Sequence, residues 1–227
     1  MPSHTIVTTN VLILGSYVEI WIYFTLLAAL MQAIRTAGQK QLTQHLNAMA
    51  TTGVRYIYAL PFAWLYLWWM LDYRQLSMPA LNTTFIQYAM IACVMQIIGT
   101  VCLVAAFKYR NFAVATSLAK TEAIQVAVLG ALLFSASLTA LGWISVVIGV
   151  VGVLLVSKVK FTYKDVFQNP GAGFGLAAGL GLAVTTLLIR QSSLALNTDL
   201  LLSAAVTLTF MITEQTLFSV VYVYSQN

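Results

Sequence analysis

Long apolar stretches dominate the hydrophobic pattern of this chain, separated by short polar connections. Crossing a bilayer core of ~30 Å takes about 20 apolar residues as a helix, and backbone groups in lipid must bond within their own segment. The alternation of polar and apolar residues that marks a membrane barrel is missing from the sequence. The pattern therefore predicts an all-α multi-pass membrane protein. About seven transmembrane helices are expected, near residues 19–41, 48–71, 84–107, 112–134, 138–157, 172–192 and 200–224.

The connections between these stretches are too short to form a soluble domain. Residues 72–83 contain Asp72, Arg74 and Pro79, and residues 158–170 contain three lysines and Pro170. Residues 1–18 form a separate N-terminal segment with no basic residue before Arg35. A cleavable signal peptide begins with positive charge, so we expect the first helix to stay uncleaved.

The second part of the chain resembles a partial copy of the first. An offset of 150 positions places Ala28 on Ala178, Lys40 on Arg190 and Asn47 on Asn197, although so weak a match can also arise by chance. Repeated halves are typical of secondary transporters, and five helices in a half make the two copies inverted in the bilayer. The predicted domains are 1–18, a five-helix unit at 19–157, a connecting loop at 158–171 and a partial second unit at 172–227.

Composition supports a membrane protein. Hydrophobic residues make up 60% of the chain and charged residues 7%, whereas soluble domains carry about 25% charged residues. The bilayer is therefore the expected surrounding medium. The net charge of +5 comes mostly from basic residues at helix ends, which indicates membrane topology and not a nucleic-acid partner.

No cofactor or metal is expected. Cys93 and Cys102 are nine positions apart in one predicted helix, about 13 Å along its axis, which is too far for a disulfide. His4 and His45 have no second ligand at a useful spacing.

The run from Gly99 to Ser157 resembles the last three helices of one half in the EamA-like family of the drug/metabolite transporter superfamily. Arg55 resembles the family's arginine near the start of its second helix, and Lys40 resembles the lysine that closes its first helix. The resemblance implies a secondary-active transporter of small organic solutes in the cell membrane, most simply the cytoplasmic membrane of a bacterium. The family usually has ten helices in two halves of five, so the resemblance also implies a truncated copy.

Two sites depart from the family pattern. Where the family often has a proline in a polar break of its fourth helix, this chain reads Lys120-Thr121-Glu122-Ala123. Where the family often has a glutamate before its fifth helix, this chain reads Phe134-Ser135-Ala136-Ser137. Both departures affect the expected mechanism more than the expected fold.

Two lines of evidence give opposite membrane orientations. With the first helix starting on one side, that side receives Arg74 and Arg190, and the other side receives at least five basic residues near helix ends. The positive-inside rule then places the N-terminus outside, which we favour, whereas the family resemblance implies a cytoplasmic N-terminus. A reporter fused after Lys164 would distinguish them, because an extracytoplasmic signal there would contradict the charge-based prediction.

Charged residues inside the predicted helices are the main functional candidates. A charge near mid-bilayer costs at least ~2.5–3.5 kcal/mol and normally faces protein or water. Two interpretations stay open: ion pairs that hold helices together, or a polar site for a solute in the middle of the membrane. The candidate residues are Arg55, Gln96, Lys120, Glu122, Gln125 and Glu214.

Helical spacing refines this picture. On a continuous helix Lys120 and Glu122 would lie about 160° apart, so each would need a partner from another helix. Polar stripes indicate either a wet central cavity or ordinary hydrogen bonds between helices. They comprise Gln32, Arg35 and Gln39; Cys93, Gln96 and Thr100; and Ser203, Thr207 and Glu214.

Glycines suggest close packing of helices. Gly175 and Gly179 form a GxxxG arrangement, which permits close backbone approach either within one chain or between two. A homodimer is therefore a possible partner state, beside the bilayer and an unidentified small-molecule substrate.

Two function classes remain: a transporter of small organic solutes, or a membrane-embedded enzyme or assembly factor. No nucleophile–base motif, His-Glu-x-x-His motif or Asp-rich pair is present in the sequence, which favours the transporter. Because the second unit looks incomplete, we expect this chain alone to show no solute flux above empty liposomes. Flux that Glu122→Gln or Glu214→Gln abolishes would instead mean that seven helices, alone or as a dimer, are a complete transporter.

Overall fold

The computed structural model describes residues 4–108, 112–134, 139–156 and 170–225, and in these residues all regular structure is helical. The chain divides into two compact units, Met1–Gln44 and His45–Asn227. The first unit contains α1 (His4–Leu42), which begins well before the predicted start near residue 19. Most of the predicted 1–18 segment is therefore helical.

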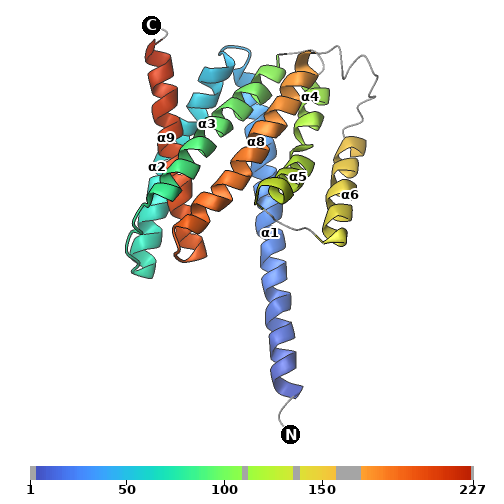
Figure 1. Cartoon of the computed structure of the whole chain (residues 1–227), viewed down its shortest axis with the longest axis vertical. Coiled ribbons are helices and arrows are strands. Elements are labelled where there is room, and N and C mark those ends of the chain that lie inside the picture. The colour runs from blue at the N-terminus through green and yellow to red at the C-terminus, as the bar shows by residue number, and fades with distance from the viewer. Residues whose placement is uncertain (1–3, 109–111, 135–138, 157–169, 226–227) are drawn as a thin grey trace. The chain divides into compact units, whose positions relative to one another are not determined.

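The second unit contains the remaining helices, which Figure 1 shows in colour order along the chain. Each predicted apolar segment corresponds to a helix, except that 112–134 is divided between two. The helices are α2 (Ala48–Arg74), α3 (Thr83–Ala106), α4 (Phe112–Ala119), α5 (Glu122–Phe134), α6 (Ala140–Val156), α8 (Pro170–Ala195) and α9 (Leu200–Ser225).

Four segments among the described residues are long and apolar enough to cross a membrane: Thr83–Ala106, Thr116–Phe134, Gly171–Ala195 and Leu200–Ser225. The prediction of an all-α multi-pass membrane protein is confirmed. Most of the predicted connecting loop, including Lys158, Lys160 and Lys164, lies outside the described residues, as does the sequence Ser135-Ala136-Ser137.

Polar residues determine where three of these helices begin. Asn47 Oδ1 accepts a hydrogen bond from Ala50 N at 2.7 Å, and Asn82 Oδ1 accepts one from Phe85 N at 2.7 Å. Asp199 Oδ2 accepts from Leu201 N at 3.2 Å. Each bond satisfies a backbone N–H that has no partner within the first helical turn. These side chains separate the apolar runs into individual helices.

Helices α2 and α9 pack in opposite directions. Near the start of α2, a Cβ on Gly53 would lie 3.1 Å from Ser219 Cβ; in its middle, Thr209 Oγ1 donates to Ala63 O at 3.1 Å. At its end, Arg74 Nη1 lies 2.9 Å from Asp199 Oδ2. These two helices are counterparts under the 150-position offset, so their antiparallel packing is the arrangement that an inverted repeat requires. The division of the chain into repeat units stays a prediction.

Glycines allow α3 and α8 to touch through their backbones. A Cβ on Gly181 would lie 2.9 Å from Gly99 Cα, and a Cβ on Gly179 would lie 3.2 Å from Ala119 O. Gly181 therefore packs against α3, and Gly179, one of the two glycines of the GxxxG arrangement, packs against α4 within the chain. A buried apolar cluster joins the same two helices to α9; it consists of Ala92 and Cys93 of α3, Leu188 of α8 and Met211 of α9.

Candidate functional site

The predicted segment 112–134 is interrupted near its middle. Lys120 and Thr121 form a turn between α4 and α5, in which Thr121 N donates to Leu118 O at 3.0 Å. This bond spans three residues instead of the four of an α-helix, and Gln125 N restores regular spacing by donating to Thr121 O at 3.1 Å. The interruption lies at the Lys120-Thr121-Glu122 sequence where the family resemblance implied a polar break.

Charged and amide side chains surround this interruption. Lys120 is exposed, and Glu122 Oε1 accepts a hydrogen bond from Thr186 Oγ1 of α8 at 3.3 Å. Thr186 Oγ1 also donates to Leu182 O at 3.0 Å. Because a hydroxyl has one hydrogen, Thr186 can satisfy only one of these acceptors at a time. The carboxylate of Glu122 therefore keeps free capacity to accept hydrogen bonds.

Gln125 extends the same polar surface. Its Nε2 donates to Thr121 Oγ1 at 3.1 Å, while its Oε1 is buried without a hydrogen-bond partner. Gly179 of α8 provides the space beside it, because a Cβ there would lie 3.2 Å from Gln125 Nε2. We call Lys120, Thr121, Glu122, Gln125 and Thr186 the break site.

A second polar group lies where α2, α3 and α9 meet. Gln215 of α9 is 1% exposed and its Nε2 donates to Gln96 Oε1 of α3 at 2.7 Å. Tyr56 of α2 is buried, with Arg55 and Thr100 as polar neighbours of its side chain. In the described residues, no hydrogen bond or ion pair joins this group to the break site. Arg55 and Gln96 therefore belong to this second group, whereas Lys120, Glu122 and Gln125 belong to the break site.

Glu214 lies near the Cys93 thiol, which contacts Met211 O at a sulfur–oxygen distance of 3.7 Å. Both cysteines are free, as their spacing predicted. Within the described part of the chain, none of the four charged site candidates is in an ion pair. Between helices of the described ranges, Arg74 instead forms an ion pair with Asp199.

The predicted polar stripe on α9 does not line a cavity. Ser203 and Thr207 are both buried. Thr207 Oγ1 donates to Ser203 O at 2.7 Å, and Ser203 Oγ lies 2.9 Å from Ser193 Oγ. These hydroxyls are satisfied by bonds within and between helices. The wet-cavity interpretation is wrong for these two residues, because the helix rotation places them against neighbouring helices.

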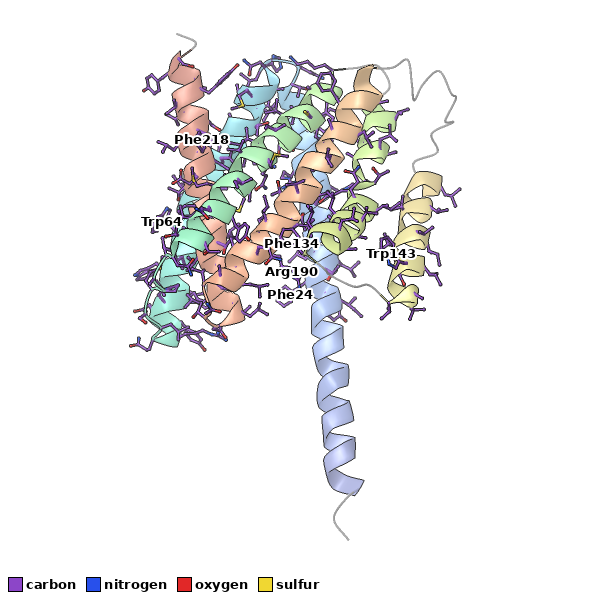
Figure 2. All side chains as sticks on the ribbon, viewed as in Figure 1. Phe24, Trp64, Phe134, Trp143, Arg190 and Phe218 are labelled. Atoms are coloured by element: carbon purple, nitrogen blue, oxygen red, sulfur yellow. The ribbon has the colours of Figure 1, made fainter. Side chains whose placement is uncertain are left out.

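Sequence analysis missed an apolar pocket between the start of α2 and the end of α9. Its volume is about 220 Å³, and its lining includes Ala50, Gly53, Ile57 and Val220. The α2–α9 pair forms the edge of the second unit opposite α6, where Figure 2 labels Trp64 and Phe218. Trp64 Nε1 donates to Thr213 Oγ1 at 3.2 Å, a further contact between these helices.

A model of the EamA-like transporter family matches residues 19–158, which is more than half of the chain. This chain belongs to the EamA-like transporter family. No curated protein and no solved structure matches it. EamA-like proteins are membrane transporters of small solutes, so the chain is a multi-pass membrane protein of a transporter family. Among the residues that the structure describes, no group of three His, Cys, Asp or Glu side chains could hold a metal ion.

The buried Gln96–Gln215 bond gives a test of helix packing in this EamA-like protein. Changing Gln96 to leucine should destabilise the protein by about 1–2 kcal/mol, because the amide of Gln215 is then left buried and unpaired. Changing Gln215 to leucine should cost less, because Gln96 is only half-buried. The double variant should lose no more than the worse single variant, which an unfolding titration arranged as a double-mutant cycle measures. Strictly additive losses would show that the two amides do not depend on each other.

Proposed function

We propose that this protein is a secondary-active transporter of small organic solutes and that the solute binds at the break site. The interruption between α4 and α5 is the observation that carries this proposal. Irregular backbone at membrane depth is tolerated where it is buried in protein or lines a water-filled cavity. In secondary transporters, interrupted helices commonly form the substrate and ion sites near the bilayer midplane.

The chemistry of the break site suits a small polar solute. Lys120 supplies a cationic donor, Glu122 an anionic acceptor, and Gln125 a buried carbonyl oxygen without a partner. An unsatisfied buried oxygen costs about 1–3 kcal/mol, which a bound donor group would recover. A solute with an ammonium group near Glu122 and an anionic group near Lys120 would use both charges.

The antiparallel α2–α9 pair supports an alternating-access mechanism. In transporters with inverted repeats, one half rocks against the other around a site at their interface. Helices α2 and α9 are counterparts in the proposed repeat. Their contact supports an interface between the two halves at this pair of helices, next to α3 and α8.

Solute binding tests the proposal directly. The purified protein, in phosphatidylcholine nanodiscs, would be screened by thermal unfolding against zwitterionic, anionic, cationic and neutral metabolites of similar size. We expect saturable stabilisation by a zwitterionic solute that is recovered chemically unchanged, with an affinity that depends on pH or on Na⁺. Liposome flux then distinguishes a complete transporter from one part of a larger assembly, while binding tests the site in either case.

An enzyme would give a different result. Conversion of the bound compound into a product by the purified protein would contradict the transporter proposal and favour the membrane-embedded enzyme. A failure of every metabolite class to bind the wild-type protein would contradict the assignment of the break site. A Gly173→Val variant is a suitable control for folding, because no atom lies within 4 Å of a Cβ there.

A further inference from the structure

We propose that Arg55, with the hydroxyl groups of Tyr56 and Thr100, binds an oxyanion, either a carboxylate or a phosphate. The site lies on α2 and α3 and is separate from the break site. The inference rests on the proposed transport function, since it assigns a negatively charged group to one ligand of this protein.

Arg55 is a half-buried cation that has no ionic partner among the described residues. It lies seven positions after the first residue of α2, about 10 Å along the helix. Its guanidinium carbon lies 4.5 Å from the centre of the Tyr56 ring, and within the described residues it forms no ion pair. A guanidinium has five N–H donors, and an aromatic face satisfies none of them in the way an oxygen acceptor does. Arg55 is only half-buried, so these donors are accessible to an added anion.

Tyr56 provides the second, independent observation. Its side chain is 2% exposed, and its hydroxyl is buried without a hydrogen bond of good geometry. The side chains of Arg55 and Thr100 lie close enough to that hydroxyl to interact with it. Thr100 is itself 3% exposed. Buried hydroxyls without partners are rare in native structures and indicate an unseen water, ion or ligand.

Arg55, Tyr56 and Thr100 bring N–H and O–H donors close together on α2 and α3. Among the described residues, neither glutamate of the candidate site forms an ion pair with Arg55, and Glu122 instead accepts a hydrogen bond from Thr186 on α8. Guanidinium and hydroxyl groups together match the geometry of carboxylate and phosphate oxygens, which Arg often binds through two parallel bonds. A cation such as Na⁺ would be repelled by the same guanidinium.

Arg74, also on α2, forms an ion pair and so provides a comparison for Arg55. Its Nη1 lies 2.9 Å from Asp199 Oδ2, and both side chains are exposed. Such a surface pair contributes only ~0–1 kcal/mol, so losing it should not unfold the protein. Arg74→Gln is therefore the matched control for Arg55→Gln, because both changes remove one arginine from α2.

The experiment measures anion binding to the full chain in phosphatidylcholine nanodiscs. The probes are sodium propionate and inorganic phosphate, with propionamide as the uncharged analogue of propionate and sodium chloride to hold the ionic strength constant. We expect at least one of the two anions to raise the midpoint temperature of the wild type saturably and propionamide to have no effect. Arg55→Gln should weaken that anion's binding at least about tenfold, the loss of one charge-assisted pair, and Arg74→Gln should not.

Two further measurements identify the source of the anion and test the site with a variant that should still fold. Replacing part of the lipid with phosphatidylglycerol should leave anion binding unchanged if a solute occupies the site; if a headgroup occupies it, this lipid should raise the midpoint temperature and compete with the added anion. Tyr56→Phe keeps the ring under Arg55 and removes only the hydroxyl, so it should fold and bind the anion about threefold to tenfold more weakly.

Three results would overturn the proposal: equal effects of propionate and propionamide, unchanged anion binding in Arg55→Gln, or unchanged binding in Tyr56→Phe when Arg55→Gln does not fold. Binding of zwitterionic metabolites at the break site is measured separately through Glu122. Loss of one site with retention of the other therefore distinguishes a failure of this inference from a failure of the proposed function.

Discussion

Glu122→Gln is expected to abolish saturable solute binding, with an affinity loss of about 100-fold or more. The substitution conserves size, and a glutamine carbonyl can still accept the hydrogen bond from Thr186 that the carboxylate accepts at 3.3 Å. Only the negative charge is removed. An ionic hydrogen bond in a site of low dielectric is worth several times a neutral one, so a cationic solute group should lose most of its binding energy. Isothermal titration or thermal unfolding in nanodiscs measures this loss.

Thr186→Val serves as the control for that experiment. It removes the hydroxyl that contacts Glu122 but keeps the charge, so we expect a change in affinity of less than about tenfold. If Glu122→Gln binds solute as tightly as the wild type, the break site is not the solute site. If both variants lose binding equally, the Thr186–Glu122 contact and not the charge determines affinity.

Gly181→Val is expected to cause the largest loss of stability, about 3 kcal/mol or more. A Cβ at this position would lie 2.9 Å from Gly99 Cα and 3.1 Å from Gly99 N and Met95 O. These are backbone atoms, which cannot move aside as a flexible side chain can. Helices α3 and α8 would have to separate, which would open the apolar cluster around Cys93 and Leu188. Denaturant titration of the purified protein measures the free energy of unfolding.

Gly173→Val is the matched control on the same helix. No atom lies within 4 Å of a Cβ at Gly173, so this variant should change stability by less than about 1 kcal/mol. Comparable losses in both variants would mean that valine itself, and not the α3–α8 contact, destabilises α8. A stable Gly181→Val variant would contradict the close approach of these two helices.

Most of the helices could be predicted from sequence because the bilayer fixes their length. Thr83–Ala106 and Leu200–Ser225 lie within two residues of the predicted segments 84–107 and 200–224. The capping residues Asn82 and Asp199 lie in the short polar breaks between apolar runs. The start of α1 at His4 was not predicted, because residues 1–18 have only a short apolar patch from Val11 to Leu14.

The interruption at Lys120–Thr121 shows where sequence reasoning was incomplete. The family resemblance implied a polar break at this position, but the angle of about 160° between Lys120 and Glu122 assumed a continuous helix. Lys120 and Thr121 form a turn and not a regular α-helix, so an angle derived from α-helical geometry does not apply across it. Neither glycine nor proline marks the turn, and a local sequence pattern alone could not locate it.

Side-chain partners were harder to predict than helices. Gln215 pairs with Gln96, yet the spacing of Ser203, Thr207 and Glu214 directed attention to its neighbour Glu214. A polar residue inside an apolar helix indicates a buried polar contact, and Gln215 is such a residue. Which of two adjacent residues faces a neighbouring helix depends on the rotation of α9, which tertiary packing determines.

The central claim is that the break site lines a water-accessible solute pathway inside the membrane. Cysteine accessibility tests it most directly, in a background in which Cys93 and Cys102 are replaced by alanine. Ala123 lies beside Glu122 on the exposed side of α5, and Leu132 is 75% exposed on the same helix. A membrane-impermeant thiol reagent should modify Ala123→Cys, bound solute should slow that reaction, and Leu132→Cys should stay unmodified in lipid. Equal reactivity at the two positions, or no protection of Ala123→Cys by a solute that binds, would contradict the account.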